Sequence, residues 1–167
     1  MSARAAWRLA SLGFKQVYRY RGGKADWLAY GLPVEGAEAG DPRAGDLARL
    51  DVPTCRLSDS IDQIQARLEG SGWDTCVVVN DEQVVLGLIR AEALDENSWR
   101  TAEEIMEPAP RTYRLSKSLD DVARYMDQQG TDSVLVTNPE GKLFGLLMRN
   151  DLEQARAELE KKRSSRE

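Results

Sequence analysis

Apolar residues follow two different spacings between residues 60 and 89. Ser60 and Gln63 form a capping box, and the apolar residues after it share one helical face: Ile61, Ile64 and Leu68. Two short apolar runs then flank a polar turn, at 76–79 and 84–89. Short apolar runs joined by a turn are typical of a β-hairpin. The pattern predicts an amphipathic helix followed by a hairpin.

The same pattern returns 58 residues later. Residues 54–94 align without a gap to residues 112–152. The aligned segments are identical at Thr54/Thr112, Arg56/Arg114, Leu57/Leu115, Ser58/Ser116, Ser60/Ser118, Asp62/Asp120, Gly72/Gly130, Asp74/Asp132, Val78/Val136, Asn80/Asn138, Glu82/Glu140, Gly87/Gly145, Leu88/Leu146 and Leu94/Leu152. A repeated unit usually needs its neighbour to bury its apolar face. We therefore expect one pseudo-symmetric domain.

Shorter elements complete each copy. Helical turns are expected at 46–50, near Ala91 up to about Asn97, and after Thr101, whose capping partner is Glu104. Pro108 and Pro110 end the last of these. The second copy predicts a helix after Ser118, strands at 133–137 and 143–148, and a final helix from Asn150 or Asp151 that frays after Arg163.

The first 36 residues have a different character. They predict a helix from Ser2 to Gly13, a short strand at 16–20 and a helical turn at 25–29. Residues 35–45 are rich in Gly, Ala and acidic residues, which is typical of a linker. A domain boundary is expected there.

Charge and composition exclude several classes. The formal charge of -5 disfavours binding to nucleic acid or to an anionic membrane. No apolar run approaches the roughly 20 residues that span a bilayer, and the N-terminus lacks a secretory signal pattern. We expect a cytoplasmic protein with no nucleic-acid or membrane partner.

The chain has no histidine and two cysteines. A Ser/His or Cys/His catalytic pair and a His-containing zinc site are therefore excluded. Cys76 aligns with Val134, so a packing role is expected, and a disulfide with Cys55 is not expected in a reducing compartment. We expect no enzyme activity, no metal and no required cofactor.

The segment "SARAAWRLASLGFKQVYRYRGGKADWLAYGLPVEG" resembles the C-terminal end of a rhodanese domain, the sulfurtransferase fold. In that family the catalytic cysteine lies just upstream of the residues that match Ser2 and Arg4. The chain has no cysteine there, and Cys55 and Cys76 lie within the first repeat. The resemblance therefore implies a relic or truncated remnant.

The tandem repeat, with "EIMEPAPRTYRLSKSLDDVARYM" between its copies and "GLIRAEAL" and "GLLMRNDL" closing them, resembles the cystathionine beta-synthase (CBS) domain pair, or Bateman module. The resemblance implies an α/β (α+β) fold: two pseudo-symmetric β-α-β-β-α motifs packed through their sheets into one disc. The expected organisation is a rhodanese-like remnant at 1–36, a linker at 37–45, motif 1 at 46–100, motif 2 at 101–155 and a charged helical tail at 156–167.

The family binds adenosine nucleotides in the clefts between its motifs. Its signature is a glycine, two apolar residues, Thr or Ser, two variable residues and Asp at a helix start. A helix N-terminus attracts phosphate, and the carboxylate accepts hydrogen bonds from ribose hydroxyls. In motif 2 the resemblance maps these roles to Gly145, Met148 at the hydroxyl position and Asp151, with Arg149 as a phosphate partner.

In motif 1 both polar positions depart from the signature. The glycine is Gly87, the hydroxyl position holds Arg90 and the carboxylate position holds Ala93. Arg90 is a candidate phosphate partner. Thr112 and Tyr113 match the backbone that lines the adenine pocket; Tyr113 either stacks on a base or simply packs as an apolar residue. Asp151 also suits an ordinary helix start.

These observations support a regulatory CBS-pair module that binds AMP, ADP, ATP or S-adenosylmethionine in at most one cleft and acts as a homodimer. One alternative is a nucleotide-independent dimerisation module, favoured by the changes at Met148, Arg90 and Ala93. Another is the C-terminal part of a split sulfurtransferase, which requires a cysteine loop encoded upstream.

Overall fold

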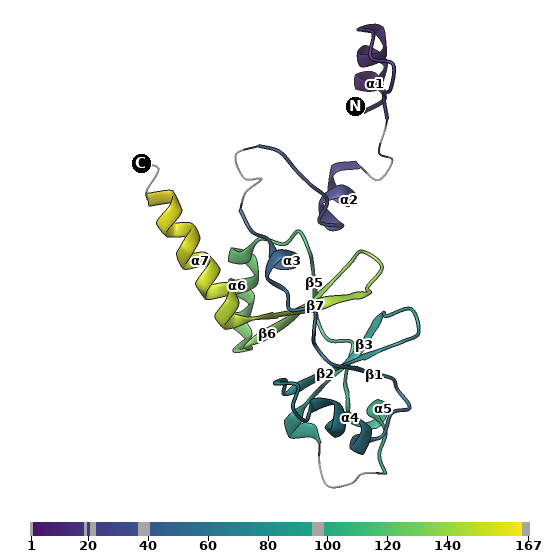
Figure 1. Cartoon of the computed structure of the whole chain (residues 1–167), viewed down its shortest axis with the longest axis vertical. Coiled ribbons are helices and arrows are strands. Elements are labelled where there is room, and N and C mark those ends of the chain that lie inside the picture. The colour runs from purple at the N-terminus through teal and green to yellow at the C-terminus, as the bar shows by residue number, and fades with distance from the viewer. Residues whose placement is uncertain (1, 19, 21–22, 37–40, 95–98, 165–167) are drawn as a thin grey trace.

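The computed structural model of the chain describes residues 2–18, 20, 23–36, 41–94 and 99–164 (Figure 1). The helices are α1 (Ser2–Ser11), α2 (Gly23–Ala29), α3 (Ala44–Leu47), α4 (Ile61–Leu68), α5 (Ala102–Ile105), α6 (Leu119–Gln129) and α7 (Arg149–Ser164), with a 3₁₀ turn η1 (Ala91–Ala93). The strands are β1 (Thr54–Cys55), β2 (Thr75–Val79), β3 (Val85–Arg90), β4 (Glu107–Pro108), β5 (Thr112–Arg114), β6 (Ser133–Thr137) and β7 (Leu143–Met148).

The strands form two small sheets, ordered β1-β2-β3-β4 and β5-β6-β7. In each sheet a short strand pairs in parallel with the first strand of an antiparallel hairpin, β1 with β2 and β5 with β6. The predicted fold class of two pseudo-symmetric motifs is confirmed. Below, motif 1 means residues 46–100 and motif 2 means residues 101–155.

The first helix of each motif, α3 or α5, packs on the opposite motif. Ala44 at the start of α3 is buried in the core of motif 2, whereas Ala102 at the start of α5 is buried in the core of motif 1. The Ala44 amide donates to Lys117 O at 2.9 Å, and the Ala102 amide donates to Asp59 O at 2.8 Å. The two donors are 58 positions apart in the sequence, and so are the two acceptors. The structural repeat thus begins about ten residues before the repeat that the sequence shows.

This exchange explains the glycine in each closing segment. The segment between α3 and β1 bridges β7 through Arg49 and Leu146, as β4 pairs with β3 through Glu107 and Leu88. A Cβ atom at Gly145 would collide with the backbone carbonyl of Arg49. The glycine is therefore needed for the close approach of the exchanged segment.

Apolar residues of both motifs form the core between the two sheets. Its buried members are Val52, Val77, Val79, Leu88, Leu135 and Leu146. The opposite face of each sheet packs against the helices of its own motif and the exchanged helix. Burying both faces of each sheet requires both motifs, so the pair folds as one unit.

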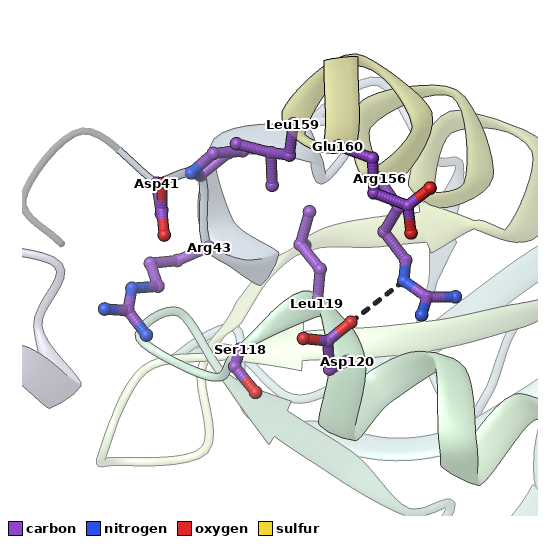
Figure 2. Close-up of a pocket in the computed structure, with 9 residues that line it drawn as sticks. Asp41, Arg43, Ser118, Leu119, Asp120, Arg156, Leu159 and Glu160 are labelled. Carbon is purple, nitrogen blue, oxygen red and sulfur yellow. Dashed lines mark hydrogen bonds and ion pairs between the residues drawn. The ribbon is translucent and has the colours of Figure 1, made fainter. Parts of the chain in front are cut away.

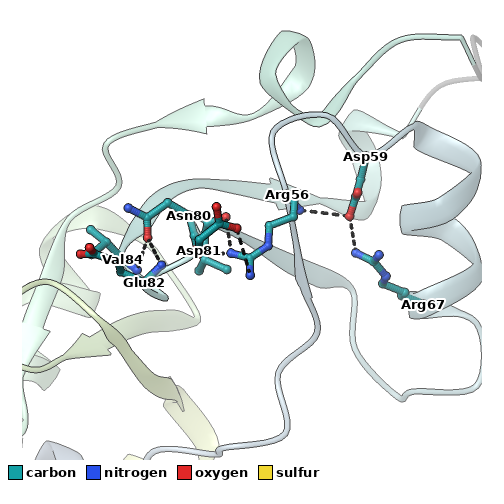
Figure 3. Close-up of polar contacts among 8 residues, drawn as sticks. Arg56, Asp59, Arg67, Asn80, Asp81, Glu82 and Val84 are labelled. Atoms are coloured by element: carbon teal, nitrogen blue, oxygen red, sulfur yellow. Dashed lines mark hydrogen bonds and ion pairs between the residues drawn. The ribbon is translucent and has the colours of Figure 1, made fainter.

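Two repeated polar residues brace the hairpins. Arg56 Nη1 donates to the carbonyl oxygens of Val79, at 3.2 Å, and of Asn80, while the Asn80 side chain accepts from the amides of Glu82 and Val84 (Figure 3). The counterparts Arg114 and Asn138 make equivalent bonds in motif 2. Repetition of these residues therefore has a structural explanation without a ligand.

The N-terminal region departs from expectation in part. α1 and α2 are present, but the strand expected at 16–20 is not formed at the described residues 16–18 and 20. A strand there has no described neighbour with which to complete a ladder. α3 starts within the expected linker, at Ala44, and only η1 forms near Ala91; residues 95–98 lie outside the described part.

α7 begins at Arg149, one or two residues earlier than expected, and continues to Ser164. Among the described residues, no helix is both long and apolar enough to cross a membrane.

Candidate functional site

The carboxylate of Asp151 is paired with Arg49, which lies in the segment before β1. Asp151 is the third residue of α7, and Arg49 lies in the exchanged segment that bridges β7. The guanidinium is bidentate: Nε lies 2.7 Å from Oδ2 and Nη2 lies 2.8 Å from Oδ1. Bidentate Arg–carboxylate pairs are the stronger and more directional ion pairs. The carboxylate expected to bind ribose thus already has two hydrogen-bond donors.

A tryptophan completes this group. The Arg49 guanidinium lies 6.0 Å from the centroid of the Trp73 ring, and Trp73 Nε1 donates to Asp51 Oδ2 at 3.4 Å. We call Arg49, Asp51, Trp73 and Asp151 the Asp151 cluster. Met148 and Trp73 both pack against the core between the sheets. The cluster offers one aromatic face, one cation and two carboxylates at the junction of the motifs.

The electrostatics of the cluster favour the ionised pair. The hydrogen bond from Arg49 holds the pKa of the Asp151 carboxyl below its usual value, although partial burial acts in the opposite direction. The same bond raises the pKa of Arg49. Both groups are therefore charged at neutral pH.

The pseudo-equivalent position in motif 1 has different chemistry. Arg90 replaces Met148, and its Nη1 lies 2.6 Å from Oε2 of Glu107, the counterpart of Arg49. Both line a small cavity of about 60 Å³ together with Arg111, Ser133 and apolar residues of both motifs. We call this the Arg90 cavity. Ala93 stands at the position equivalent to Asp151, so motif 1 has no carboxylate there to accept hydrogen bonds from a ribose.

Arg149 lies away from the Asp151 cluster. Its guanidinium contacts Asp127 at 2.6 Å, Asp132 at 3.2 Å and Glu153 at 3.7 Å. It also donates to Thr131 O at 2.9 Å. These bonds tie the start of α7 to the end of α6, which gives Arg149 a structural role. The expected pairing of Arg149 with a phosphate stays a prediction.

Thr112 and Tyr113 belong to β5, paired with Leu135 and Val136 of β6. Tyr113 is only 8 % exposed and belongs to the core beneath α6. Its ring contacts Tyr125 at 5.3 Å, and the Arg111 guanidinium lies over both rings. The placement favours the packing role over base stacking.

A polar pocket of about 270 Å³ lies on the outer surface, where residues 41–43 approach α6 and α7. Arg156 Nε bonds to Asp120 Oδ1 at 3.0 Å across it (Figure 2). The pocket contains none of the expected site residues. Its contacts join α7 to α6, through Arg156 and Asp120, and residue Arg43 to Ser118 at the cap of α6.

The thiols of Cys55 and Cys76 are free and buried in the core of motif 1. Burial and the neighbouring Cys76 thiol raise the pKa of the Cys55 thiol. Over the described residues, no group of three His, Cys, Asp or Glu side chains is arranged to hold a metal ion. The position of the thiols agrees with the expected packing role of Cys76.

Comparison with known proteins shows what this architecture is similar to. The family model of the CBS domain matches residues 102–158, within motif 2 and α7. The crystal structure of CBSX2 in complex with AMP is 21 % identical with a TM-score of 0.64, covering 71 % of this chain and 98 % of that one.

Two further structures are similar. The cytosolic domain of the Mg²⁺ channel MgtE in complex with ATP is 20 % identical with a TM-score of 0.65, covering 68 % of this chain and 48 % of that one. The CBS domains of a transcriptional regulator from Streptococcus pneumoniae are 20 % identical with a TM-score of 0.63, covering 67 % and 97 %. These similarities show the fold and, with the family match, support a tandem CBS domain pair. The rhodanese-like resemblance of residues 1–36 stays a prediction.

Sequence reasoning found Asp151 but missed Arg49, Asp51 and Trp73. Arg49 and Asp51 lie before the aligned repeat, which begins at residue 54. Trp73 lies within it, but the aligned residue in the second copy is Thr131, so the alignment does not single it out. One signal was available: Arg49 and Glu107 are 58 positions apart, and they make equivalent bridges, to Leu146 and to Leu88. An alignment extended back to Arg43 and Thr101 would have included Arg49 and Glu107 as an aligned pair.

Proposed function

We propose that the chain is a regulatory CBS-pair module that binds an adenosine nucleotide of the AMP, ADP or ATP class at the Asp151 cluster, and that it acts as a homodimer. The observation that carries this is the position of Asp151 in the first turn of α7, beside Arg49 and Trp73. A carboxylate for ribose, a cation for phosphate and an aromatic face for a base are the groups that such a ligand requires.

Binding needs an exchange of partners at Asp151. A ribose that donates both hydroxyls to the carboxylate replaces the two Arg49 hydrogen bonds, and the released guanidinium then pairs with a phosphate. The side chain of Arg49 is half exposed, so it has room to reorient. The ligand breaks the charge-assisted contact between Arg49 and Asp151, and only a phosphate gives Arg49 a new one. The affinity therefore depends on the phosphate. Adenosine alone is expected to bind weakly.

The test is thermal unfolding of the full chain with AMP, ADP, ATP, S-adenosylmethionine or adenosine. A ligand that binds only the folded state at a hundredfold excess over Kd stabilises it by roughly 2.7 kcal/mol. We expect a shift with at least one phosphorylated nucleotide, its loss in Asp151→Ala, and a much smaller shift with adenosine.

Two controls separate the site from general effects. Asp62→Ala removes an exposed carboxylate from the first turn of α4 and should leave the nucleotide response intact. Arg49→Gln frees Asp151 but removes the phosphate partner, so it should bring the responses to AMP and adenosine closer together. Equal shifts in wild type and Asp151→Ala would contradict this site.

The second candidate is a dimerisation module that binds no nucleotide. The occupied Asp151 carboxylate and the methionine at the hydroxyl position favour it. In that case none of the nucleotides changes the unfolding temperature, and Arg49→Gln lowers it without creating a response. A wild-type shift that Asp151→Ala abolishes would exclude this candidate.

A further inference from the structure

The N-terminal region presents an unusually apolar surface. Eight of the eleven large apolar side chains that are exposed in the described part of the chain lie within residues 7–34: Trp7, Leu9, Leu12, Phe14, Tyr18, Tyr20, Tyr30 and Val34. α1 and α2 enclose a groove of about 400 Å³ between them. We call residues 2–34 the arm. Clustered exposed apolar side chains mark an interaction surface.

The arm is also charged oppositely to the rest of the chain. Residues 1–34 contain six Lys or Arg and one Asp, a charge of +5. Because the whole chain carries -5, residues 35–167 carry -10. Within them, residues 46–100 of motif 1 hold eleven acidic and five basic residues, a charge of -6. The arm is thus complementary to motif 1 in charge.

In the described part of motif 1, residues 46–94 and 99–100, no helix corresponds to α7, which packs on α6 in motif 2. Met126 of α6 and Leu152 of α7 are 0 % and 1 % exposed. Their counterparts Leu68 and Leu94 are only partly buried, and the described residues at the position of α7 form only the 3₁₀ turn η1. Trp99, two residues before the cap of α5, is 75 % exposed.

We infer that the arm docks on this helix-poor face of motif 1 in a second copy of the chain, where its α1 takes the place that α7 occupies on motif 2. Apolar residues Trp7, Leu12 and Phe14 would cover Leu68, Leu94 and Trp99, with the net positive charge of the arm against the net negative charge of motif 1. The inference does not depend on nucleotide binding.

The geometry favours a second copy over the arm's own motif 1. The base of the arm is anchored on motif 2, where Tyr30 Oη donates to Glu140 Oε1 at 2.9 Å and Gly31 lies against Leu115. Figure 1 shows α1 and α4 at opposite ends of the long axis of the molecule. Reciprocal exchange of arms between two copies forms a closed two-fold dimer, the commonest form of oligomer.

The first test measures dimer dissociation by sedimentation equilibrium of the full chain. Trp7→Ser with Phe14→Ser removes two large exposed side chains and should weaken the dimer about 100-fold or more. Leu50→Ser is the matched control, because Leu50 is 69 % exposed but lies outside both surfaces, and it should leave dissociation unchanged. An unaltered dimer in the double variant, or a monomeric wild type, overturns the inference.

The second test identifies the contact by cross-linking. Chains carrying Ala10→Cys on α1 are mixed with chains carrying Ala66→Cys on α4 and treated with a short bismaleimide; the native thiols are buried and should not react. A product containing one chain of each kind is expected. The motif 2 counterpart, Arg124→Cys in place of Ala66→Cys, should give little product.

Two outcomes would assign the arm elsewhere. Cross-linking only within a chain that carries both cysteines would show docking on its own motif 1. A chain that stays monomeric but binds phosphatidylserine vesicles through Trp7 and Phe14 would show that the arm covers a membrane surface instead. Either result contradicts exchange between copies.

Discussion

Motif 1 and motif 2 share a backbone plan but differ in what covers their helices and what occupies their polar positions. Motif 2 has the longer helix α6, the 16-residue α7 and the carboxylate of Asp151. Motif 1 has the eight-residue α4, the turn η1 and Ala93 at the equivalent position. The arginine and asparagine side chains that hold the hairpin backbones, and the exchanged helices, occur in both motifs. The polar residues of the expected nucleotide site do not. The comparison separates residues kept for folding from those available for a specific function.

The largest difference is expected at the last repeated leucine. Leu152→Ala, on the buried face of α7, should lower the free energy of unfolding by about 3 kcal/mol, since a buried side chain is lost and a cavity remains. Leu94→Ala at the half-buried counterpart should cost about 1 kcal/mol. Urea unfolding of both variants measures the difference. Equal losses would mean that motif 1 is covered as fully as motif 2.

The two signature glycines should also respond unequally. Gly145→Ala would place a methyl group against the Arg49 backbone, whereas Gly87→Ala would meet the Met106 side chain. A flexible side chain can move aside, but an exchanged backbone segment cannot do so without losing its bridge. Destabilisation of about 2–3 kcal/mol is expected for Gly145→Ala and about 1 kcal/mol for Gly87→Ala in chemical denaturation. A greater loss at Gly87 would reverse the comparison.

The hairpin turns provide a smaller test. Gln83 has a φ of 65°, and its counterpart Gly141 has a φ of 81°. Only glycine adopts this region without steric cost, so Gln83→Gly should stabilise the protein by about 0.5–1 kcal/mol, provided that the flexibility it adds to the unfolded chain is the smaller effect. Gly141→Ala, the control, should be destabilising. A thermal melt that moves down for Gln83→Gly would contradict the strain argument.

The smallest effect is expected from the ion pair at Asp151. Its pKa is lowered in the folded state, so its contribution to stability is fully present above the unfolded value of about 3.9 and is lost as pH falls through the folded pKa. Wild type should therefore lose more stability than Arg49→Gln between about pH 4 and pH 2. Both side chains are partly exposed, so the difference is small. The measurement is the free energy of unfolding of both proteins as a function of pH. Two curves of the same slope in this range would contradict a stabilising ion pair.

Local patterns were sufficient for most elements. The capping boxes at Ser60 and Thr101, the paired apolar runs and the 58-residue spacing predicted the helices and hairpins that the structure shows. The strand expected at 16–20 failed, because a strand also needs a partner that local sequence does not supply. The contrast lies between helices, whose hydrogen bonds are local, and strands, whose bonds are not.

The amino-acid sequence by itself determined the duplication, the order of elements and the position of Asp151 at a helix start. Only the tertiary structure decided that the first helix of each motif packs on the other motif and that Arg49, 102 positions away in the sequence, holds Asp151. Periodicity reports which face of an element is buried, but it does not report which element buries it. Partners in an exchanged arrangement are brought together by the packing of the two sheets, and that packing exists only in the folded chain.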